Sequence, residues 1–191
     1  MASDQECDEV DVFSCMRERR SIREFTDEAV SDKELYAILE AGTHAPSAGN
    51  MQAREFVIVR SPEGREAVAA TTDAGITSRG TVLTQRWVSR ADVIIVICYD
   101  RRRMGARYGD KGRTDMSKLD CMGVAQNMML ATTALGLGTT CVIGFDAGRL
   151  KDVLGIPAEL TPLLLLPVGR PAVQPQQVSR LQVEELIRAV R

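Results

Sequence analysis

The pattern of apolar and polar positions divides the chain into alternating helices and strands. In the segment "SDKELYAILEAG" (31–42), apolar residues recur every three or four positions, and Ser31 and Glu34 stand at the spacing of a capping box. This pattern predicts a helix with a defined start. Ser61 and Pro62 predict the start of another helix, because serine caps helix N-termini and proline fits the first helical position.

Runs of apolar and β-branched residues predict the strands. The segment "ADVIIVICYD" (91–100) is apolar almost throughout, which is typical of a central strand covered on both faces. Asp146 is a candidate cap for a short helix between two further strands. The predicted strands are 55–60, 91–100, 139–145 and 160–169, and shorter helices are predicted over 10–18, 62–71 and 146–155.

The longest helical segment runs from Leu119 to Leu137 and is apolar on nearly every side. Such a helix is expected to be buried. Ser117 and Asp120 stand at capping-box spacing and predict where it starts. The basic stretch before it, "RRRMGARYGDKGR" (101–113), is interpreted as a solvated loop.

Helices and strands therefore interleave along a chain of 191 residues with no repeat and no linker. This organisation predicts one domain over 1–191, of class α/β or α+β, in which helices cover a sheet. The C-terminal segment 172–191 carries a loosely helical apolar pattern. We expect it to pack on its own domain or on a partner subunit.

Charge and cysteine usage narrow the classes of function. Lysine plus arginine (24) nearly balances aspartate plus glutamate (26), so no domain-wide positive field favours nucleic acid. The N-terminus lacks a signal-peptide pattern, and no apolar run approaches the roughly 20 residues of a membrane helix.

Five cysteines without a CxxC pair favour a reducing cytoplasm. His44 is the only histidine, so no metal site is predicted, and the chemistry of an enzyme would fall to a bound cofactor.

The stretch "RRSIREF" (19–25) places three guanidiniums and a hydroxyl together in a chain of net charge -2. Such a group supplies the charge-assisted donors that a phosphate ester accepts. The alternative is that these arginines follow a helix, interact with its C-terminal dipole and are solvated. The stretch alone favours this second interpretation.

Two other segments raise similar choices. Residues 46–50 form a turn of small residues in which Asn50 can donate and accept hydrogen bonds, although an ordinary helix-to-strand loop explains them equally well. Gly136 and Gly138 resemble the start of a dinucleotide fingerprint, but they follow a helix, so they are interpreted as its end. Gly144 follows an apolar strand and would permit close approach of a flat ligand.

The order of four motifs carries more information than any one of them. "RRSIREF", "APSAGNMQAREFVIV", "GVAQNMMLATTALGLGTTCVIGF" and "LLLLPVGRP" together resemble the FMN-dependent nitroreductase family over residues about 15 to 171. The resemblance implies that the first motif holds the FMN phosphate, that the second lies along the isoalloxazine, that a backbone N–H of the third approaches N5, and that the fourth returns to the phosphate. The residues carried over, in that order, are Arg19, Arg20, Ser21 and Arg23; Pro46, Ser47 and Asn50; Ile143 and Gly144; and Gly169 and Arg170.

The resemblance also implies a fold and an activity. The expected fold is a central mixed β-sheet wrapped by helices, assembled as an intertwined homodimer with FMN at the interface. The expected enzyme is an NAD(P)H-dependent FMN oxidoreductase in which hydride passes to flavin N5 and then, in a ping-pong cycle, to a nitroaromatic, quinone or related acceptor. No side-chain acid or base is obligatory. A specialised flavin enzyme, such as a dehalogenase or a flavin-fragmenting enzyme, and a non-catalytic flavin-binding module are the alternatives.

At some positions the sequence does not decide between a role in binding and a structural role. The family often has Gln-Pro-Trp where this chain has Gln52-Ala53-Arg54, which predicts a less rigid and more cationic loop. The arginines at 101–103 either bind a nucleotide 2′-phosphate or face water, so NADH and NADPH are not distinguished. Trp87 either covers the flavin or packs beside a strand. The physiological acceptor is not specified.

Overall fold

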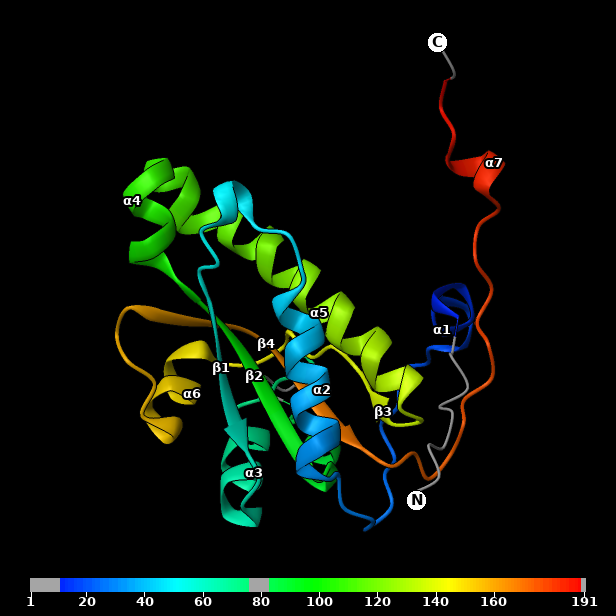
Figure 1. Cartoon of the computed structure of the whole chain (residues 1–191). Helices are drawn as coiled ribbons and strands as arrows, with labels where there is room; N and C mark the ends of the chain where they lie inside the picture. The colour runs from blue at the N-terminus through cyan, green and yellow to red at the C-terminus, as the bar shows by residue number, and fades with distance from the viewer. Residues whose placement is uncertain (1–10, 76–82, 190–191) are drawn as a thin grey trace, which may run out of the picture.

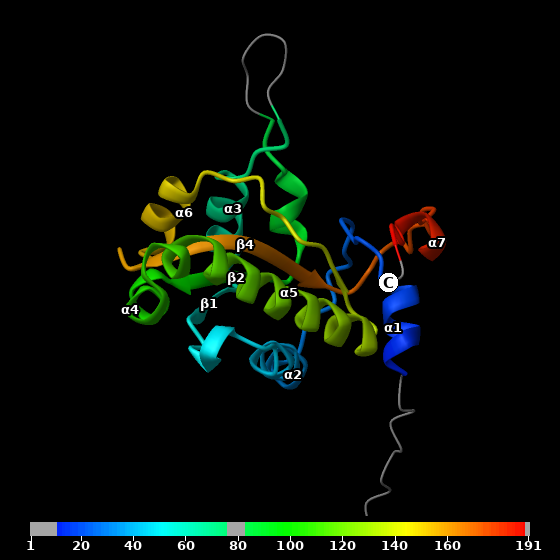
Figure 2. The ribbon, with the colours of Figure 1, turned by 90° about the horizontal axis from the view of Figure 1, so that it is seen from above.

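The computed structural model describes residues 11–75 and 83–189. A four-stranded sheet in the order β1-β2-β4-β3 lies at the centre, with helices on both faces (Figures 1 and 2). This arrangement confirms an α+β class with a sheet wrapped by helices. The strands are β1 (Arg54–Val59), β2 (Val93–Asp100), β3 (Gly138–Thr139) and β4 (Leu160–Gly169), and the helices are α1 (Val12–Glu18), α2 (Asp32–Thr43), α3 (Pro62–Ala69), α4 (Arg101–Lys111), α5 (Ser117–Ala134), α6 (Ala147–Leu154) and α7 (Val183–Leu186).

The central strand β2 divides the interior into two cores. Its residues alternate between the faces of the sheet, so Ile95 and Ile97 pack with α2 and α5, whereas Ile94 and Val96 pack with the side that carries α3 and α6. All four side chains are fully buried. The prediction that 91–100 is a central strand covered on both faces is confirmed.

Local capping explains where several helices begin. Ser31 and Glu34 form the predicted capping box of α2, and the Ser61 hydroxyl accepts from the Gly64 N–H at the start of α3. Asp146 caps α6 by accepting from the Arg149 N–H. These three helix starts are confirmed.

Two predictions around 101–120 are wrong. Residues 101–111 form helix α4, because Asp100 accepts the backbone N–H groups of Arg102 and Arg103 and caps it. The capping box at Ser117 is absent: a π-helical turn, Gly112–Met116, leads directly into α5, and the Ser117 hydroxyl donates to the Gly112 carbonyl at 2.6 Å. A charged surface helix lacks the apolar stripe by which a helix is recognised in a sequence. Helix α4 was therefore predicted as a loop.

The sheet also differs from expectation in detail. Strand β3 is Gly138–Thr139, so only Thr139 of the predicted strand 139–145 lies in a strand, and Val142 joins Leu165 through an isolated bridge. The pairings between named strands are antiparallel. The expected mixed character rests, within the described ranges, on one parallel bridge between Ser21 and Thr139.

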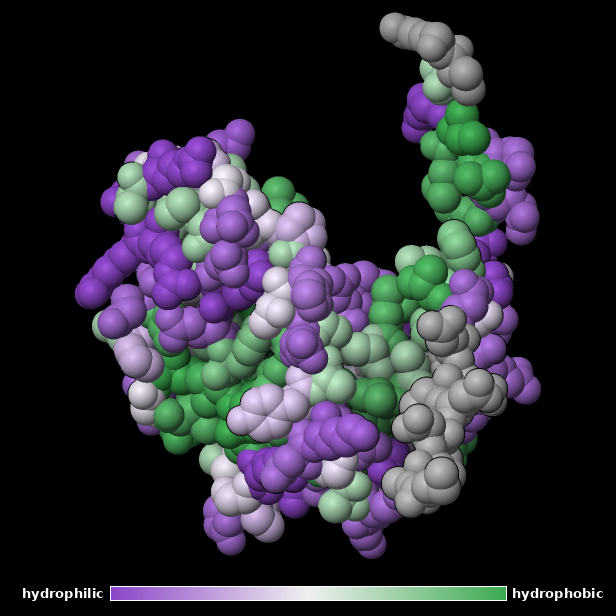
Figure 3. Space-filling model, viewed as in Figure 1, coloured by the Kyte–Doolittle hydropathy of each residue, from purple (hydrophilic) through white to green (hydrophobic). Residues whose placement is uncertain are grey.

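Beyond β4 the chain leaves the domain as an extended arm, residues 172–189. All its described residues are exposed, and α7 is a single turn near its end. Figure 1 shows it projecting from the rest of the molecule, and Figure 3 shows hydrophobic residues along it. The exposed apolar residues of the arm are Val173, Val178, Leu181, Val183, Leu186 and Ile187. Within the two described ranges, no helix has both the length and the hydropathy needed to cross a membrane.

We expect Ile97→Ala to lower the free energy of unfolding by about 2 to 5 kcal/mol, because it leaves a cavity between the sheet and α5. Ile58→Ala on the edge strand is the matched control, since Ile58 is already 36% exposed and should cost less than about 1.5 kcal/mol. Urea denaturation measures both. Equal losses would contradict the assignment of the core.

Candidate functional site

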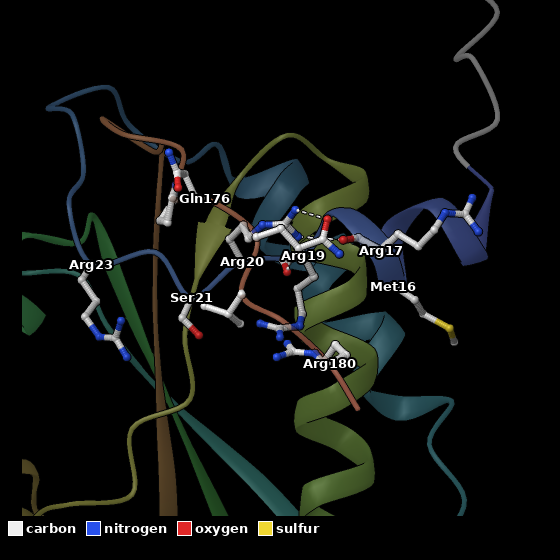
Figure 4. Close-up of a pocket in the computed structure, with 11 residues that line it drawn as sticks. Met16, Arg17, Arg19, Arg20, Ser21, Arg23, Gln176 and Arg180 are labelled. Carbon is white, nitrogen blue, oxygen red and sulfur yellow. Dashed lines mark hydrogen bonds between the residues drawn. The ribbon is translucent and has the colours of Figure 1, made fainter. Parts of the chain in front are cut away.

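An open pocket of about 480 Å³ lies between the end of α1 and the first part of the arm. Figure 4 shows that Arg19, Ser21 and Arg180 approach one another there, whereas Arg23 lies apart. The motif at 19–23 supplies one wall and residues 175–180 supply the other. The lining residues are Met16, Arg17, Arg19, Arg20, Ser21, Arg23, Pro175, Gln176, Gln177, Val178 and Arg180.

The arginines of this pocket are used differently. Arg20 donates to the carbonyls of Arg17 and Arg19 and to the Gln177 side chain, so it joins α1 to the arm. The guanidiniums of Arg19 and Arg180 make no hydrogen bond or ion pair to any residue in the described ranges. Two unengaged guanidiniums beside a serine hydroxyl form a donor set that fits a phosphate monoester.

The segment 139–144 starts beside Ser21. The Ile22 N–H donates to the Thr139 carbonyl at 3.1 Å. The segment that carries Ile143 and Gly144, the residues predicted to face N5, therefore begins next to the predicted phosphate motif. The Ile143 side chain is 71% exposed and free to contact a ligand. The Gly144 carbonyl accepts from the Asp73 N–H at 2.8 Å, and an added Cβ at Gly144 would collide with the Asp73 carbonyl. The glycine thus permits close packing of two loops.

Arg23 is engaged by an aromatic side chain, Trp87. The Arg23 guanidinium carbon lies 5.8 Å from the centroid of the Trp87 ring, a cation–π contact. Trp87 is half-buried against the second core, so packing accounts for at least part of its role. The Arg23 charge lies apart from Arg19 (Figure 4).

Gly169 and Arg170 lie at the end of β4 but do not line the pocket. The Arg170 guanidinium pairs with Glu28 at 3.0 Å and with Glu34 at 2.8 Å. An added Cβ at Gly169 would press on the Phe25 ring. Both residues therefore support the chain that carries the motif 19–23 instead of facing the space beside Arg19.

We expect Arg170→Met to lower stability at neutral pH by about 1 kcal/mol, because it removes an ion pair of limited exposure. Burial acts to raise the pKa of Glu34, but hydrogen bonds from Ser31 and Arg170 hold it below its ordinary value of 4.5. A lowered pKa stabilises the folded state above that value, and the contribution is lost as pH falls. The difference in Tm between variant and parent should therefore shrink below about pH 4.5. A difference that grows in acid would contradict this role.

The loop with Pro46, Ser47 and Asn50 lies at the other end of α5. The Ala48 N–H donates to the Asp120 carboxylate near the start of α5, whereas Arg20 shares a surface hollow with Thr133 near its end. At 1.5 Å per residue, 13 helical residues span about 20 Å. One chain therefore does not bring the two parts of the predicted site together.

The residue that was expected to make this loop more cationic is turned into the protein. Arg54, expected to make the loop more cationic, is only 9% exposed, and its guanidinium donates to the Thr43 carbonyl. Asn50 itself is exposed and has a left-handed backbone with φ 54°. His44 is exposed at the end of α2.

Side chains that carry out chemistry are scarce in the described part of the chain. Burial raises the pKa of the Cys98 and Cys121 thiols to about 12, so neither is a ready nucleophile. No group of three potential metal-ligating side chains occurs within residues 11–75 and 83–189. The site so described can bind and orient a ligand that brings its own reactivity.

Arg180 is the residue that the sequence did not reveal. It lies in the polar segment "VQPQQVSR", far from the first motif in the chain, and reaches the pocket only because the arm passes α1. A lone arginine in such a segment carries no local pattern, so only the tertiary structure identifies it.

Comparison with known proteins identifies the family of the chain. The family model "Nitroreductase family" matches residues 16–170. The NADPH-flavin oxidoreductase of Vibrio harveyi is 28% identical over 176 residues, which cover 88% of this chain and 69% of that protein. An NADH dehydrogenase of Thermus thermophilus is 27% identical over 205 residues, covering 93% and 95%.

Solved structures give the same result. A nitroreductase family protein from Streptococcus pneumoniae has a TM-score of 0.81 at 28% identity and covers 94% of this chain and 100% of its own. The Vibrio harveyi NADPH:FMN oxidoreductase complexed with NAD+ has a TM-score of 0.80 at 25% identity, with coverage of 94% and 77%. The family model spans most of the chain, and the fold matches over nearly all of it. This chain belongs to the nitroreductase family.

Proposed function

We propose that the protein is an FMN-dependent oxidoreductase that takes electrons from NAD(P)H and passes them to a small acceptor. The observation that carries this proposal is the pair of unengaged guanidiniums, Arg19 and Arg180, beside Ser21 in a chain of this family. The names of the similar Vibrio harveyi proteins, an NADPH-flavin and an NADPH:FMN oxidoreductase, support the cofactor and the donor.

Residues of this chain would hold and orient the cofactor. Arg19, Ser21 and Arg180 bind the phosphate, and Gly169 and Arg170 support the chain that carries them. When bound, FMN supplies the acceptance and transfer of hydride. Arg23 places a positive charge near the flavin, which favours the negative charge of the reduced ring, while Ile143 and Gly144 offer backbone groups along its edge.

A homodimer would complete the site, with the loop Pro46, Ser47 and Asn50 supplied by the partner subunit. Two observations support this proposal. The loop and the phosphate pocket lie about 20 Å apart within one chain, by the length of α5 between them. Helix α5 also exposes Leu119 (71%) and Met122 (42%), an apolar edge suited to a second copy.

Nitroaromatics and quinones are the proposed acceptors. The name of a Salmonella typhimurium relative, an oxygen-insensitive NADPH nitroreductase that is 28% identical over 175 residues, supports nitro reduction. Buried thiols at Cys15, Cys98 and Cys121 suit a reducing compartment, and we propose the cytoplasm.

The visible absorption spectrum of the purified protein tests this function. Flavin bands should be present or appear when FMN is added, bleach under anaerobic NADH or NADPH, and return when a quinone is added. A protein that binds FMN but is not reduced by either nucleotide would be the non-catalytic binding module. A protein that fails to take up FMN would overturn the assignment of the pocket.

A further inference from the structure

The loop 46–52 has an unusual backbone. Asn50 and Gln52 adopt left-handed conformations with φ 54° and 48°, beside Gly49 at 56°. The left-handed region is disfavoured for a residue with a side chain, and asparagine tolerates it better than glutamine. Such conformations persist only where the surroundings hold them.

Two arginines of α4 hold this loop by its carbonyl groups. Arg107 donates to the Gly49 carbonyl at 3.1 Å, and Arg103 donates to the Gln52 carbonyl at 2.7 Å. These carbonyls lie on either side of Asn50 in the chain. Arg103 is itself fixed by ion pairs with Glu55 at 3.3 Å and with Asp100 at 3.6 Å. Hydrogen bonds from a charged donor are stronger than those between neutral groups, so they offset the cost of two left-handed residues.

The other side of the loop is attached to α5. The Ala48 N–H donates to Asp120, and the Ser47 hydroxyl accepts from the Gln52 N–H at 3.0 Å. An added Cβ at Gly49 would meet the side chains of Arg107 and Tyr108, so α4 packs closely on the loop. The loop is therefore held between α5 on one side and α4 on the other.

We propose that Arg103 and Arg107 are positioning residues that hold Asn50 in the conformation in which it meets the flavin. This inference rests on the proposed function, since it concerns the partner-supplied part of the same site. The family often has a proline after Gln52, which would restrain the backbone there. In this chain the two arginines restrain it instead. Without them the left-handed residues would relax toward extended backbone, and the Asn50 amide would turn away.

Hydrogen exchange in the FMN-free protein tests the mechanical part of this inference. The amides of Asn50, Met51 and Gln52 are bonded within the loop, so they report whether it stays closed. Arg103→Met and Arg107→Met should each accelerate their exchange about tenfold. Arg101→Met is the matched control, because Arg101 lies on the same helix and its side chain does not contact the loop. Unchanged exchange in both variants would overturn the inference.

A double-mutant cycle on FMN affinity tests the link to Asn50. Arg107→Met should raise the Kd for FMN about tenfold in the parent and less than about twofold in an Asn50→Ala background, because the arginine acts through Asn50. An equal effect in both backgrounds would mean a general structural role and would overturn the inference. If the parent protein bound no FMN, the proposed function would fail first, and the exchange data would still decide whether the arginines hold the loop.

Discussion

A variant with Arg19→Ala and Arg180→Ala together is expected to lose bound FMN during purification. Each guanidinium lines the pocket with no other partner in the described ranges, so each is available for a charge-assisted phosphate contact. Such contacts contribute about 1.5 to 3 kcal/mol each. Two of them correspond to roughly two to four orders of magnitude in Kd. Fluorescence titration of the FMN-free protein measures the change directly.

The matched control for this double variant is Arg17→Ala. Arg17 lines the same pocket, but its guanidinium donates to the Ser14 hydroxyl at 2.9 Å and lies 3.7 Å from the Asp11 carboxylate. Its removal should change the Kd by less than about threefold, because an exposed pair of this kind contributes little. If Arg17→Ala weakened FMN binding as much as the double variant, the loss would reflect pocket charge in general and the assignment of Arg19 and Arg180 would be wrong.

The hydrophobic pattern predicted those parts of the fold that are built from buried side chains. Strands β2 and β4 and helices α2, α3 and α6 follow from apolar runs and local caps. Helix α4 was not predicted, because its residues are mostly charged and its only local signal is the cap at Asp100. The segment 139–145 is apolar enough for a strand, but of its residues only Thr139 lies in β3, and Val142 makes an isolated bridge to β4. Pairing depends on a partner strand, which a single segment cannot reveal.

The candidate site was predictable only where its residues are adjacent in the chain. Arg19 and Ser21 were found through one short motif, and both line the pocket. Arg180 was missed because its position depends on the path of the arm. The Arg170 side chain pairs with Glu28 and Glu34 instead of lining the pocket. Composition and spacing do not specify which of several arginines will be paired with acids.

If the protein forms the proposed homodimer, Leu181→Glu with Leu186→Glu is expected to convert it into monomers that bind FMN at least tenfold more weakly. Both leucines are 65% exposed, on an arm whose large apolar residues are each more than half exposed. Burying each on a partner would contribute about 1.5 to 3 kcal/mol, and a symmetric dimer has two arms. The sum of at least about 6 kcal/mol corresponds to roughly four orders of magnitude in the dissociation constant of the dimer.

This variant keeps Arg180, so it separates loss of the partner from loss of a phosphate ligand. Light scattering gives the oligomeric state, and titration gives the Kd for FMN on the same sample. Arg188→Glu is the control, because it reverses a charge on the same exposed arm without removing apolar surface. It should stay dimeric. An unaltered protein that is monomeric and yet retains FMN would contradict the shared site, because one chain holds the phosphate pocket and the Asn50 loop at opposite ends of α5.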